Sequence, residues 1–546
     1  MKKLFSSKIY FRRPPLEDYL TTYNNLLADI LIENFSIKYL SSLTINRYEQ
    51  ETHLYQRVEQ YIQIRKILTN DNNISIVLQN EDVFLYDMLI NEFPNRIYGH
   101  KKNTFSTQIK FIYKIILSFI YYQIVAMVCS LIPRKINEYD YIFRTYFDDR
   151  NIGPPLREEY LGPLVDDLSK NNKVICVFSL LGTSRYLIKY LACRKTGSFS
   201  ATLIESFLTP TSVAKAHINF LKSKIILQKK IIYKGVNITP LIQKSLDNEY
   251  INRRGLHVFL EYEAAKKVVQ LKARKLFMPF ENQPWEKVYR IIRDKYNPGL
   301  KLAAHQHSSV SLKLLHQFPP INEKKLPVYP DEIFTNGKIF KRLFAEKAHY
   351  PSKLLEGAAL RMYKHQLNNK FTIKERNNSL SKNIVYAFSY DVSNYSKIVK
   401  TLIDVFANSK VTIFLKFHPD YTIDYILSKL DFELPSNFIV ATKYSWEEIY
   451  NIVDAVLFDD NSIGIEGLIN GKNTFYVQLV DPIYYTDRNF YIDRDIIHDE
   501  SDLITLKEKI ENGTYQLEFD RDKIQHYIHF YFTPYIPEIH IPLFTQ

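Results

Sequence analysis

Two polar sites in the last third of the chain follow apolar runs that are typical of buried strands. The run 415–417 ends in His418, whose backbone is restricted by Pro419, and the run 455–458 leads to Asn461-Ser462 at a predicted helix start. Ligands of open α/β sheets bind beyond the carboxyl ends of the strands, so both sites are placed to bind a phosphate. A histidine can donate a hydrogen bond to it, and the N–H groups of a first helical turn form an anion site. An ordinary loop histidine and a plain helix cap are the alternatives.

The amino-terminal half offers carboxylates at an equivalent position. Glu281 follows the apolar run 275–280, so its carboxylate is expected at the carboxyl edge of a sheet. There it could take the proton of an attacking hydroxyl, and the alternative is that it caps the helix containing Trp285. Asp148, beside Asp149, is the second acidic candidate.

We expect further polar residues of this half to line a cleft on the acceptor side, where the molecule with the attacking hydroxyl would bind. They are His305, His307, Arg157 and Asn282. At least one of the two histidines is expected to be structural. The acidic pairs Asp148-Asp149 and Asp459-Asp460 are compatible with a metal ion. Because helix N-termini and basic side chains can neutralise a leaving phosphate, we predict no essential metal and no cofactor.

Alternating strand-like and helix-like segments must position these residues. In the first half we predict strands at 141–147, 174–180, 201–207, 257–262, 276–280 and 302–305. In the second half we predict strands at 383–388, 411–417, 438–441, 455–458 and 474–480, with helices from about 394, 424, 446 and 463. This alternation predicts α/β architecture with parallel sheets.

The chain is too long for one ordinary core, which favours two domains. We predict two Rossmann-like domains facing a cleft. The expected division is an N-terminal helical and α/β region at 1–110, an apolar helix at 111–135, a Rossmann-like acceptor domain at 136–330, a linker or crossover at 331–380 and a Rossmann-like donor domain at 381–546.

One segment is apolar enough to contact a membrane. Residues 115–133 carry no charge, and Lys110, Lys114, Arg134 and Lys135 flank them. About 20 apolar residues are needed to cross a bilayer, so the length is borderline. Basic residues at both ends indicate no crossing direction, and a helix lying in the cytoplasmic leaflet fits better. A buried core helix and a true span are the alternatives.

Composition narrows the possible partners. The formal net charge is +13, which suits an anionic lipid surface or a phosphorylated sugar. The basic residues form no recognisable nucleic-acid signature, so we expect no nucleic acid partner. Cys129, Cys176 and Cys193 lie in apolar stretches and are expected to be reduced thiols in the cytoplasm. We find no signal peptide pattern near Met1.

The pattern at His418-Pro419 and Asn461-Ser462 resembles the HP and SS motifs of bacterial sialyltransferases, polysialyltransferases and Kdo transferases. The resemblance implies that His418, Pro419, Asn461, Ser462, Ile463 and Glu466 bind the CMP of a CMP-sugar. The family pair is Ser-Ser, and this chain has Asn461 at the first position.

Several blocks from about 140 to 365 are similar to a family of bacterial surface-carbohydrate biosynthesis proteins. They include 147–149 with 157–164, 279–286, 304–309, 335–337 and 357–361. This resemblance implies work on lipopolysaccharide O-antigen, capsule or a similar glycan.

Together, the two resemblances imply a GT-B-type glycosyltransferase in the cytoplasm, peripheral to the inner membrane. Its donor would be a nucleotide-sugar, plausibly CMP-activated Kdo or nonulosonic acid, and its acceptor a lipid-linked or surface glycan. The catalytic set would be Glu281, His418 and Asp148. A UDP- or GDP-sugar transferase, a polyol-phosphate transferase, and a non-catalytic scaffold of polysaccharide assembly are the alternatives.

Overall fold

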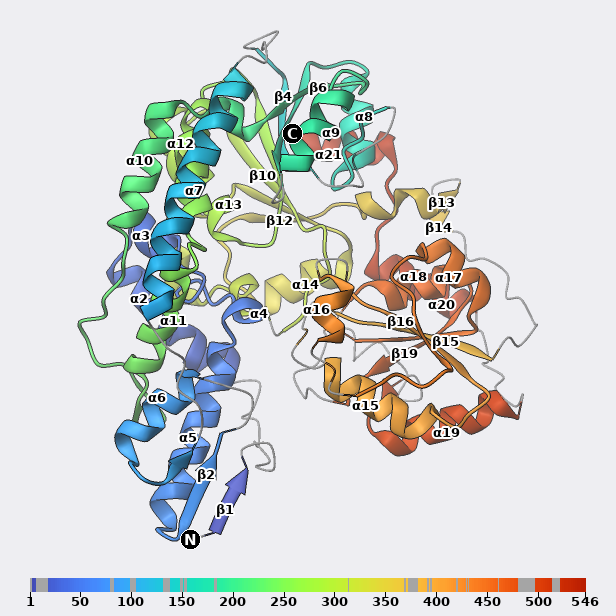
Figure 1. Cartoon of the computed structure of the whole chain (residues 1–546). Coiled ribbons are helices and arrows are strands. Elements are labelled where there is room, and N and C mark those ends of the chain that lie inside the picture. The colour runs from blue at the N-terminus through green and yellow to red at the C-terminus, as the bar shows by residue number, and fades with distance from the viewer. Residues whose placement is uncertain are drawn as a thin grey trace.

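Two parallel β-sheets with their helices form two lobes (Figure 1). The computed structural model describes residues 2–5, 18–78, 83–98, 105–130, 138–147, 151, 155–180, 184–312, 314–367, 370–371, 382–389, 392, 395–418, 421–428, 430, 432–459, 461–479, 496–512 and 521–546. Asp148, Asp149, Pro419 and Asp460 lie outside the described residues.

The sheet of the first lobe has seven parallel strands in the order β12-β11-β10-β9-β4-β5-β6. They are β4 (Tyr141–Phe147), β5 (Val174–Leu180), β6 (Ser200–Leu203), β9 (Lys275–Pro279), β10 (Lys301–His305), β11 (Glu332–Thr335) and β12 (Lys353–Glu356). All five residues of β9 are buried, as expected for a parallel sheet with both faces covered. The strand order reverses between β4 and β9, which creates a topological switch point.

The main helices that connect these strands are α8 (Gly162–Ser169), α9 (Ser184–Cys193), α10 (Pro210–Leu221), α11 (Thr239–Ile251), α12 (Leu256–Val268), α13 (Pro284–Tyr296) and α14 (Lys338–Lys347). A short hairpin, β7 (Ile232–Tyr233) and β8 (Val236–Asn237), precedes α11. The strand predicted at 257–262 is wrong, because this run lies within α12. Most residues of α12 are buried, so its apolar residues lack the one-sided spacing that reveals a helix.

The boundary predicted at residue 330 is also wrong. β11 and β12 pair in register with each other, and β11 pairs with β10, so residues 332–356 complete the first sheet. The prolines between 319 and 330 belong to the loop that joins β10 to β11 within one domain. The 3₁₀ turn η7 (Leu360–His365) and a small hairpin, β13 (Gln366–Leu367) and β14 (Lys370–Phe371), follow β12.

The amino-terminal region packs onto the first lobe. Its elements are β1 (Lys2–Phe5), α2 (Asn24–Glu33), α3 (Ile37–Leu40), α4 (Glu49–Thr52), α5 (Leu54–Asn70), β2 (Ile74–Val77), α6 (Val83–Glu92), β3 (Ile97–Tyr98) and the long helix α7 (Phe105–Ser130). The three strands form a small parallel sheet in the order β1-β2-β3. A buried ion pair of 2.5 Å between Arg47 and Glu323 ties this region to the loop before β11.

The second lobe repeats the same topology. Its six parallel strands follow the order β17-β16-β15-β18-β19-β20. The strands are β15 (Asn383–Ala387), β16 (Thr412–Lys416), β17 (Phe438–Val440), β18 (Ala455–Phe458), β19 (Asn473–Val477) and β20 (Ile496–Ile497). The helices are α15 (Tyr395–Phe406), α16 (Ile423–Leu427), α17 (Trp446–Ile452), α18 (Ile463–Ile469) and α19 (Glu500–Glu511). Every strand and helix predicted for this half is confirmed, and so is the GT-B-like fold class with two Rossmann-like domains.

The carboxyl-terminal chain returns to the first lobe (Figure 1). Helix α20 (Arg521–Tyr531) contacts both α14 and α18, and α21 (Pro537–Thr545) packs against α8. The Phe544 ring lies 4.5 Å from the Phe334 ring, and Lys275 Nζ donates to the Phe544 carbonyl at 2.8 Å. The last residues of the predicted donor domain therefore belong to the core of the first lobe.

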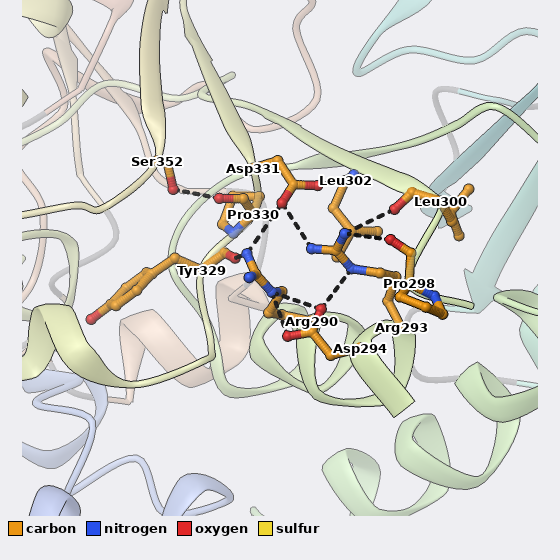
Figure 2. Close-up of polar contacts among 10 residues, drawn as sticks. All are labelled: Arg290, Arg293, Asp294, Pro298, Leu300, Leu302, Tyr329, Pro330, Asp331 and Ser352. Atoms are coloured by element: carbon orange, nitrogen blue, oxygen red, sulfur yellow. Dashed lines mark hydrogen bonds and ion pairs between the residues drawn. The ribbon is translucent and has the colours of Figure 1, made fainter. Parts of the chain in front are cut away.

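An arginine–aspartate network closes the amino-terminal edge of the first sheet, and Figure 2 shows its contacts. Asp331 Oδ1 accepts from Arg293 Nη2 at 2.8 Å and from Arg290 Nη1 at 3.2 Å. Its Oδ2 accepts the N–H of Leu302 at 2.9 Å, and Arg290 also pairs with Asp294 at 2.8 Å. These bonds attach the last turns of α13 to the first residues of β10 and β11.

Candidate active site

The carboxyl edge of the first sheet brings Glu281 and His307 together, next to the switch point. Glu281 follows β9 and His307 follows β10, and the two strands pair in register up to Pro279 and His305. Glu281 Oε1 lies 3.4 Å from His307 Nε2, while Gln283 Nε2 donates to Glu281 Oε2 at 2.5 Å. The Glu281 side chain is 25% exposed and that of His307 only 5%. A carboxylate reachable from solvent therefore faces a nearly buried imidazole.

The loop that carries Glu281 is held by Glu286, in the first turn of α13. The Glu286 carboxylate accepts the N–H groups of Glu281 at 3.0 Å and Asn282 at 2.9 Å. Burial raises the pKa of Glu286 well above its usual range, and the charge of Glu281 raises it further. Glu286 therefore makes the contacts expected of a cap, and the Glu281 side chain instead faces His307.

Asn282 supports this loop rather than lining a cleft. It is buried and has a positive φ of 56°, which Asn tolerates better than most residues. Its Nδ2 donates to the His316 carbonyl at 2.5 Å, so the side chain is directed into the protein. The prediction that Asn282 contacts an acceptor is not supported by this geometry.

Two tyrosines that the sequence prediction missed flank the Glu281–His307 pair. The Tyr160 ring packs edge-on against His307 at 5.1 Å and lies 5.4 Å from the ring of Tyr146 in β4. Burial raises the pKa of Tyr146 well above its usual range, and the nearby Glu281 charge adds to this. Buried Glu158 holds the Tyr160 loop by accepting the Thr145 hydroxyl at 2.5 Å and the Tyr160 N–H at 3.1 Å.

His305 is structural. Its side chain is fully buried, and its Nε2 donates to the Ala358 carbonyl at 2.8 Å. The Phe544 ring lies 6.0 Å away, and burial lowers the pKa of His305 to about 4. A neutral histidine inside the core does not reach a substrate, so the prediction that His305 lines the acceptor side of the cleft is wrong, and His305 is the structural member of the two histidines.

Of the other two residues predicted for this half, the structure describes only Arg157, which is exposed. Burial raises the pKa of Asp166 in α8, and the charge of exposed Arg157 offsets part of this rise. Asp148 lies outside the described residues, and its catalytic role stays a prediction. Among the described residues, no three His, Cys, Asp or Glu side chains gather as a metal site.

The second sheet brings His418 and Ser462 to one edge. Ala387 of β15 pairs with Lys416 on one side and with Phe458 on the other, so β16 and β18 end at the same level. Neighbouring strands lie about 4.8 Å apart, so the two chain segments that follow β16 and β18 start about 10 Å apart. Ser389, just beyond β15, donates to Asp459 at 3.1 Å and links the central strands at the switch point.

Asn461 and Gly464 fix the start of α18. Asn461 Oδ1 accepts the Ile463 N–H at 3.0 Å, which is the contact expected from the helix-cap alternative. Its Nδ2 donates to the Ala387 carbonyl at 2.9 Å. The N–H of Ile463 is thus already used within the protein. A Cβ at Gly464 would lie 2.1 Å from the Phe458 ring, so glycine is needed for this close packing. Ser462 Oγ donates to Glu466 at 3.4 Å.

Charges from the first lobe reach α18. Burial raises the pKa of Glu466, while the charges of Lys364 and Arg361 in η7 lower it. The Arg361 guanidinium also lies 5.7 Å from the centre of the Tyr160 ring. Arg361 therefore lies over the Tyr160 ring of the first lobe, and its charge acts on Glu466 of α18 in the second. The sequence prediction missed this role, because only the packing of the lobes reveals it.

Comparisons with known proteins leave the family open. No family model and no curated protein sequence matches the chain. Solved structures that are similar include the UDP complex of S. aureus MnaA, at 11% identity and TM-score 0.39, covering 74% of this chain and 94% of that one. The calicheamicin glycosyltransferase CalG4 is 8% identical with TM-score 0.40 and coverages of 72% and 94%. The wall teichoic acid polymerase TagF is 12% identical with TM-score 0.34 and coverages of 79% and 93%. At such TM-scores the likeness carries no argument about activity.

Proposed function

We propose that this chain is a metal-independent glycosyltransferase that moves a sugar from a nucleotide donor to a bacterial surface glycan. The observation that supports this best is Arg361, whose guanidinium lies over Tyr160 and whose charge acts on Glu466. A donor phosphate at the edge of the second sheet and an acceptor hydroxyl beside Glu281 would both lie near this cation. Ligand sites at the switch points of two such sheets are the general expectation for this architecture.

Each residue has a role in this chemistry. The acceptor oxygen attacks the anomeric carbon, its proton passes to Glu281, and the bond from that carbon to the phosphate oxygen breaks. The bonding electron pair leaves with the nucleotide phosphate, whose charge Arg361, Lys364 and His418 would stabilise. His307 would orient the Glu281 carboxylate.

The proposed donor is a CMP-activated Kdo or nonulosonic acid. Its support is the sequence pattern at His418 and Asn461-Ser462, whose two members follow strands on either side of β15. The proposed acceptor is a lipid-linked glycan at the cytoplasmic face of the inner membrane. A helix long and apolar enough to cross a membrane, Ile109–Cys129, supports this location by composition only.

A nucleotide panel tests the donor class. Purified protein is melted with CMP, CDP, UDP and GDP, because only a ligand that binds the folded state raises the Tm. At about 100 times its Kd, a ligand stabilises by about 2.7 kcal/mol. We expect the largest shift with CMP. A shift with UDP or GDP alone would replace the donor, and a shift with CDP alone would favour polyol-phosphate transfer. No shift with any nucleotide, and no turnover of activated sugars, would leave the scaffold alternative.

His418→Ala tests the donor site itself. The variant should lose the CMP-dependent shift and sugar transfer, while its own stability changes by less than about 1 kcal/mol, because the side chain is only half-buried. His498→Ala is the control. His498 follows β20, the strand at the edge of the same sheet that lies away from β16. A His418→Ala protein with full transfer activity would end this assignment.

A further inference from the structure

Helix α7 has apolar residues on opposite faces. Ile115, Val125, Ala126 and Cys129 are buried against the first lobe. The opposite face is exposed, and its residues recur at helical spacing: Ile109, Ile112, Tyr113, Ile116, Leu117, Ile120, Ile124, Met127 and Val128. Ile112 and Ile116, for example, are 58% and 52% exposed. A helix that is apolar all round is normally covered on all sides, so this outer face is suited to an apolar environment.

Helix α10 lies beside α7 and extends the same surface (Figure 1). Gln123 Nε2 donates to the carbonyl of Pro210, the first residue of α10, at 3.0 Å. Further back along α7, Phe119 packs on His217 at 5.3 Å. The two helices are therefore antiparallel, and α10 adds exposed Ile218 and Leu221. We call these exposed residues of α7 and α10 the α7/α10 surface.

The antiparallel arrangement gathers lysines at one end of the α7/α10 surface. Near the start of α7, Phe111 packs on Tyr250 at 5.1 Å, and the Tyr250 hydroxyl donates to the carbonyl of Leu221 at 2.9 Å. The exposed lysines of this end are Lys110, Lys114, Lys222 and Lys224. Neither helix contains an acidic residue, and Lys224 pairs with Asp247 at 3.4 Å. The surface thus combines an apolar face with a cationic end.

We propose that the α7/α10 surface lies flat on an anionic phospholipid bilayer. Apolar side chains would enter the boundary between headgroups and acyl chains, and the lysines would contact lipid phosphates. The charge favours lipid over a second copy of this chain, because lipid phosphates can pair with these lysines, whereas neither helix offers an acidic residue with which they could pair in a second copy.

The packing of α7 argues against a span. Its inner face contacts the first lobe from Phe111 to Gln123, over about 18 Å of helix. A crossing helix would draw polar elements of the lobe into hydrocarbon, where unsatisfied polar groups are costly. Lying on the membrane is the arrangement that keeps both faces of α7 satisfied.

Vesicle flotation tests the proposal without any sugar donor, so its failure is distinct from failure of the proposed function. The full chain is floated with vesicles of phosphatidylcholine alone and of an equimolar mixture with phosphatidylglycerol. We expect binding to the mixed vesicles. Ile116→Glu should weaken it by at least about tenfold, because a buried isoleucine contributes more than one decade of affinity. Ile321→Glu, at an isoleucine that is 62% exposed outside this surface, should bind like the unmodified chain.

The lysines are tested separately. Lys110→Gln with Lys114→Gln should weaken binding to the mixed vesicles by about 25-fold, roughly fivefold for each cation, and leave binding to neutral vesicles unchanged. No flotation of the unmodified chain, or equal flotation of Ile116→Glu, would overturn the proposal. So would a dimer that Ile116→Glu dissociates in the absence of vesicle binding, because a second copy would then cover the surface.

Depth measurements separate a flat helix from a crossing one. Ile112→Trp and Ile124→Trp place reporters on the outer face of α7 about 18 Å apart along the helix axis. On a flat helix, lipids brominated near the headgroup should quench both reporters equally. Quenching of one reporter from shallow bromines and of the other from deep bromines would instead show a span and contradict the proposal.

Discussion

The two edges of the first sheet use the same helix in different ways. At the carboxyl edge, the first turn of α13 contributes Glu286, which holds the loop that presents Glu281 to His307. At the amino edge, the last turns contribute Arg290 and Arg293, which pair with Asp331 and Asp294. One edge keeps a carboxylate partly exposed beside an imidazole, and the other compensates each charge with an opposite one. We propose that the first edge serves the chemistry and the second stability.

Replacing Glu281, at the carboxyl edge, should have the largest effect, and this effect should be on catalysis rather than on stability. Glu281→Gln keeps the shape and the contact with Gln283 but cannot take a proton, so we expect kcat to fall by about 10²–10⁴-fold. The Tm should change little, because the side chain is partly exposed. Rates with the donor identified by the nucleotide panel check this result. A variant that transfers sugar at the original rate would remove Glu281 as the base.

Replacing Arg361 should cause the second-largest loss of activity. Arg361→Ala removes the cation between Tyr160 and Glu466, and we expect kcat/KM to fall by about 10–100-fold, the range for one charged contact. Lys353→Ala, at an exposed lysine that opens β12, is the control and should retain activity. Equal activities of the two variants would mean that Arg361 does not act on the donor.

A substitution at the amino edge should lower the stability of the protein and leave its catalysis unchanged. Asp331→Asn weakens the pairs with Arg290 and Arg293, and Arg293 is nearly buried, so we expect a loss of about 2 kcal/mol in the free energy of unfolding. Denaturant titration measures the loss, and kcat of the remaining folded protein should be unchanged. A normal stability combined with reduced kcat would reverse the roles assigned to the two edges.

A pH dependence should be the smallest effect. The pKa of Glu286 is raised above its ordinary 4.5, so the unfolded chain binds fewer protons than the folded one between 4.5 and the raised pKa. Stability from this group is therefore present below about pH 4.5 and is lost as the pH rises through that window. Glu286→Gln should flatten this dependence in thermal melts across the window. An unchanged slope in the variant would assign it to other groups.

How well sequence predicts this molecule depends on what surrounds each segment. The first five strands of the second lobe are short apolar runs between clear helix starts, and they were predicted, whereas the two-residue strand β20 was missed. The run 257–262 resembles a strand because α12 is buried on most faces. β11 and β12 were hidden among prolines that belong to a loop inside the domain. The error at 257–262 arises where burial removes the periodic pattern of a helix, and the error at β11 and β12 where a loop inside a domain has the composition of a linker.

The candidate site shows the same division. Glu281 and His307 could be predicted because each lies just beyond the end of a strand, and parallel strands end at one edge. His305 also ends a strand, but its burial under Phe544 depends on a helix more than 200 residues later. Arg361 and Tyr160 became candidates only once the lobes were packed together. Strand ends are local signals, whereas contacts between lobes are not.

The position of a bound nucleotide phosphate tests the central claim most directly. A crystal structure with CMP, or with the tightest nucleotide of the panel, locates that phosphate relative to both lobes. We predict a phosphate at the carboxyl edge of the second sheet, within hydrogen-bond reach of His418 and facing Arg361. A phosphate bound at the amino edge beside Arg290, or on a surface remote from both switch points, would contradict the account.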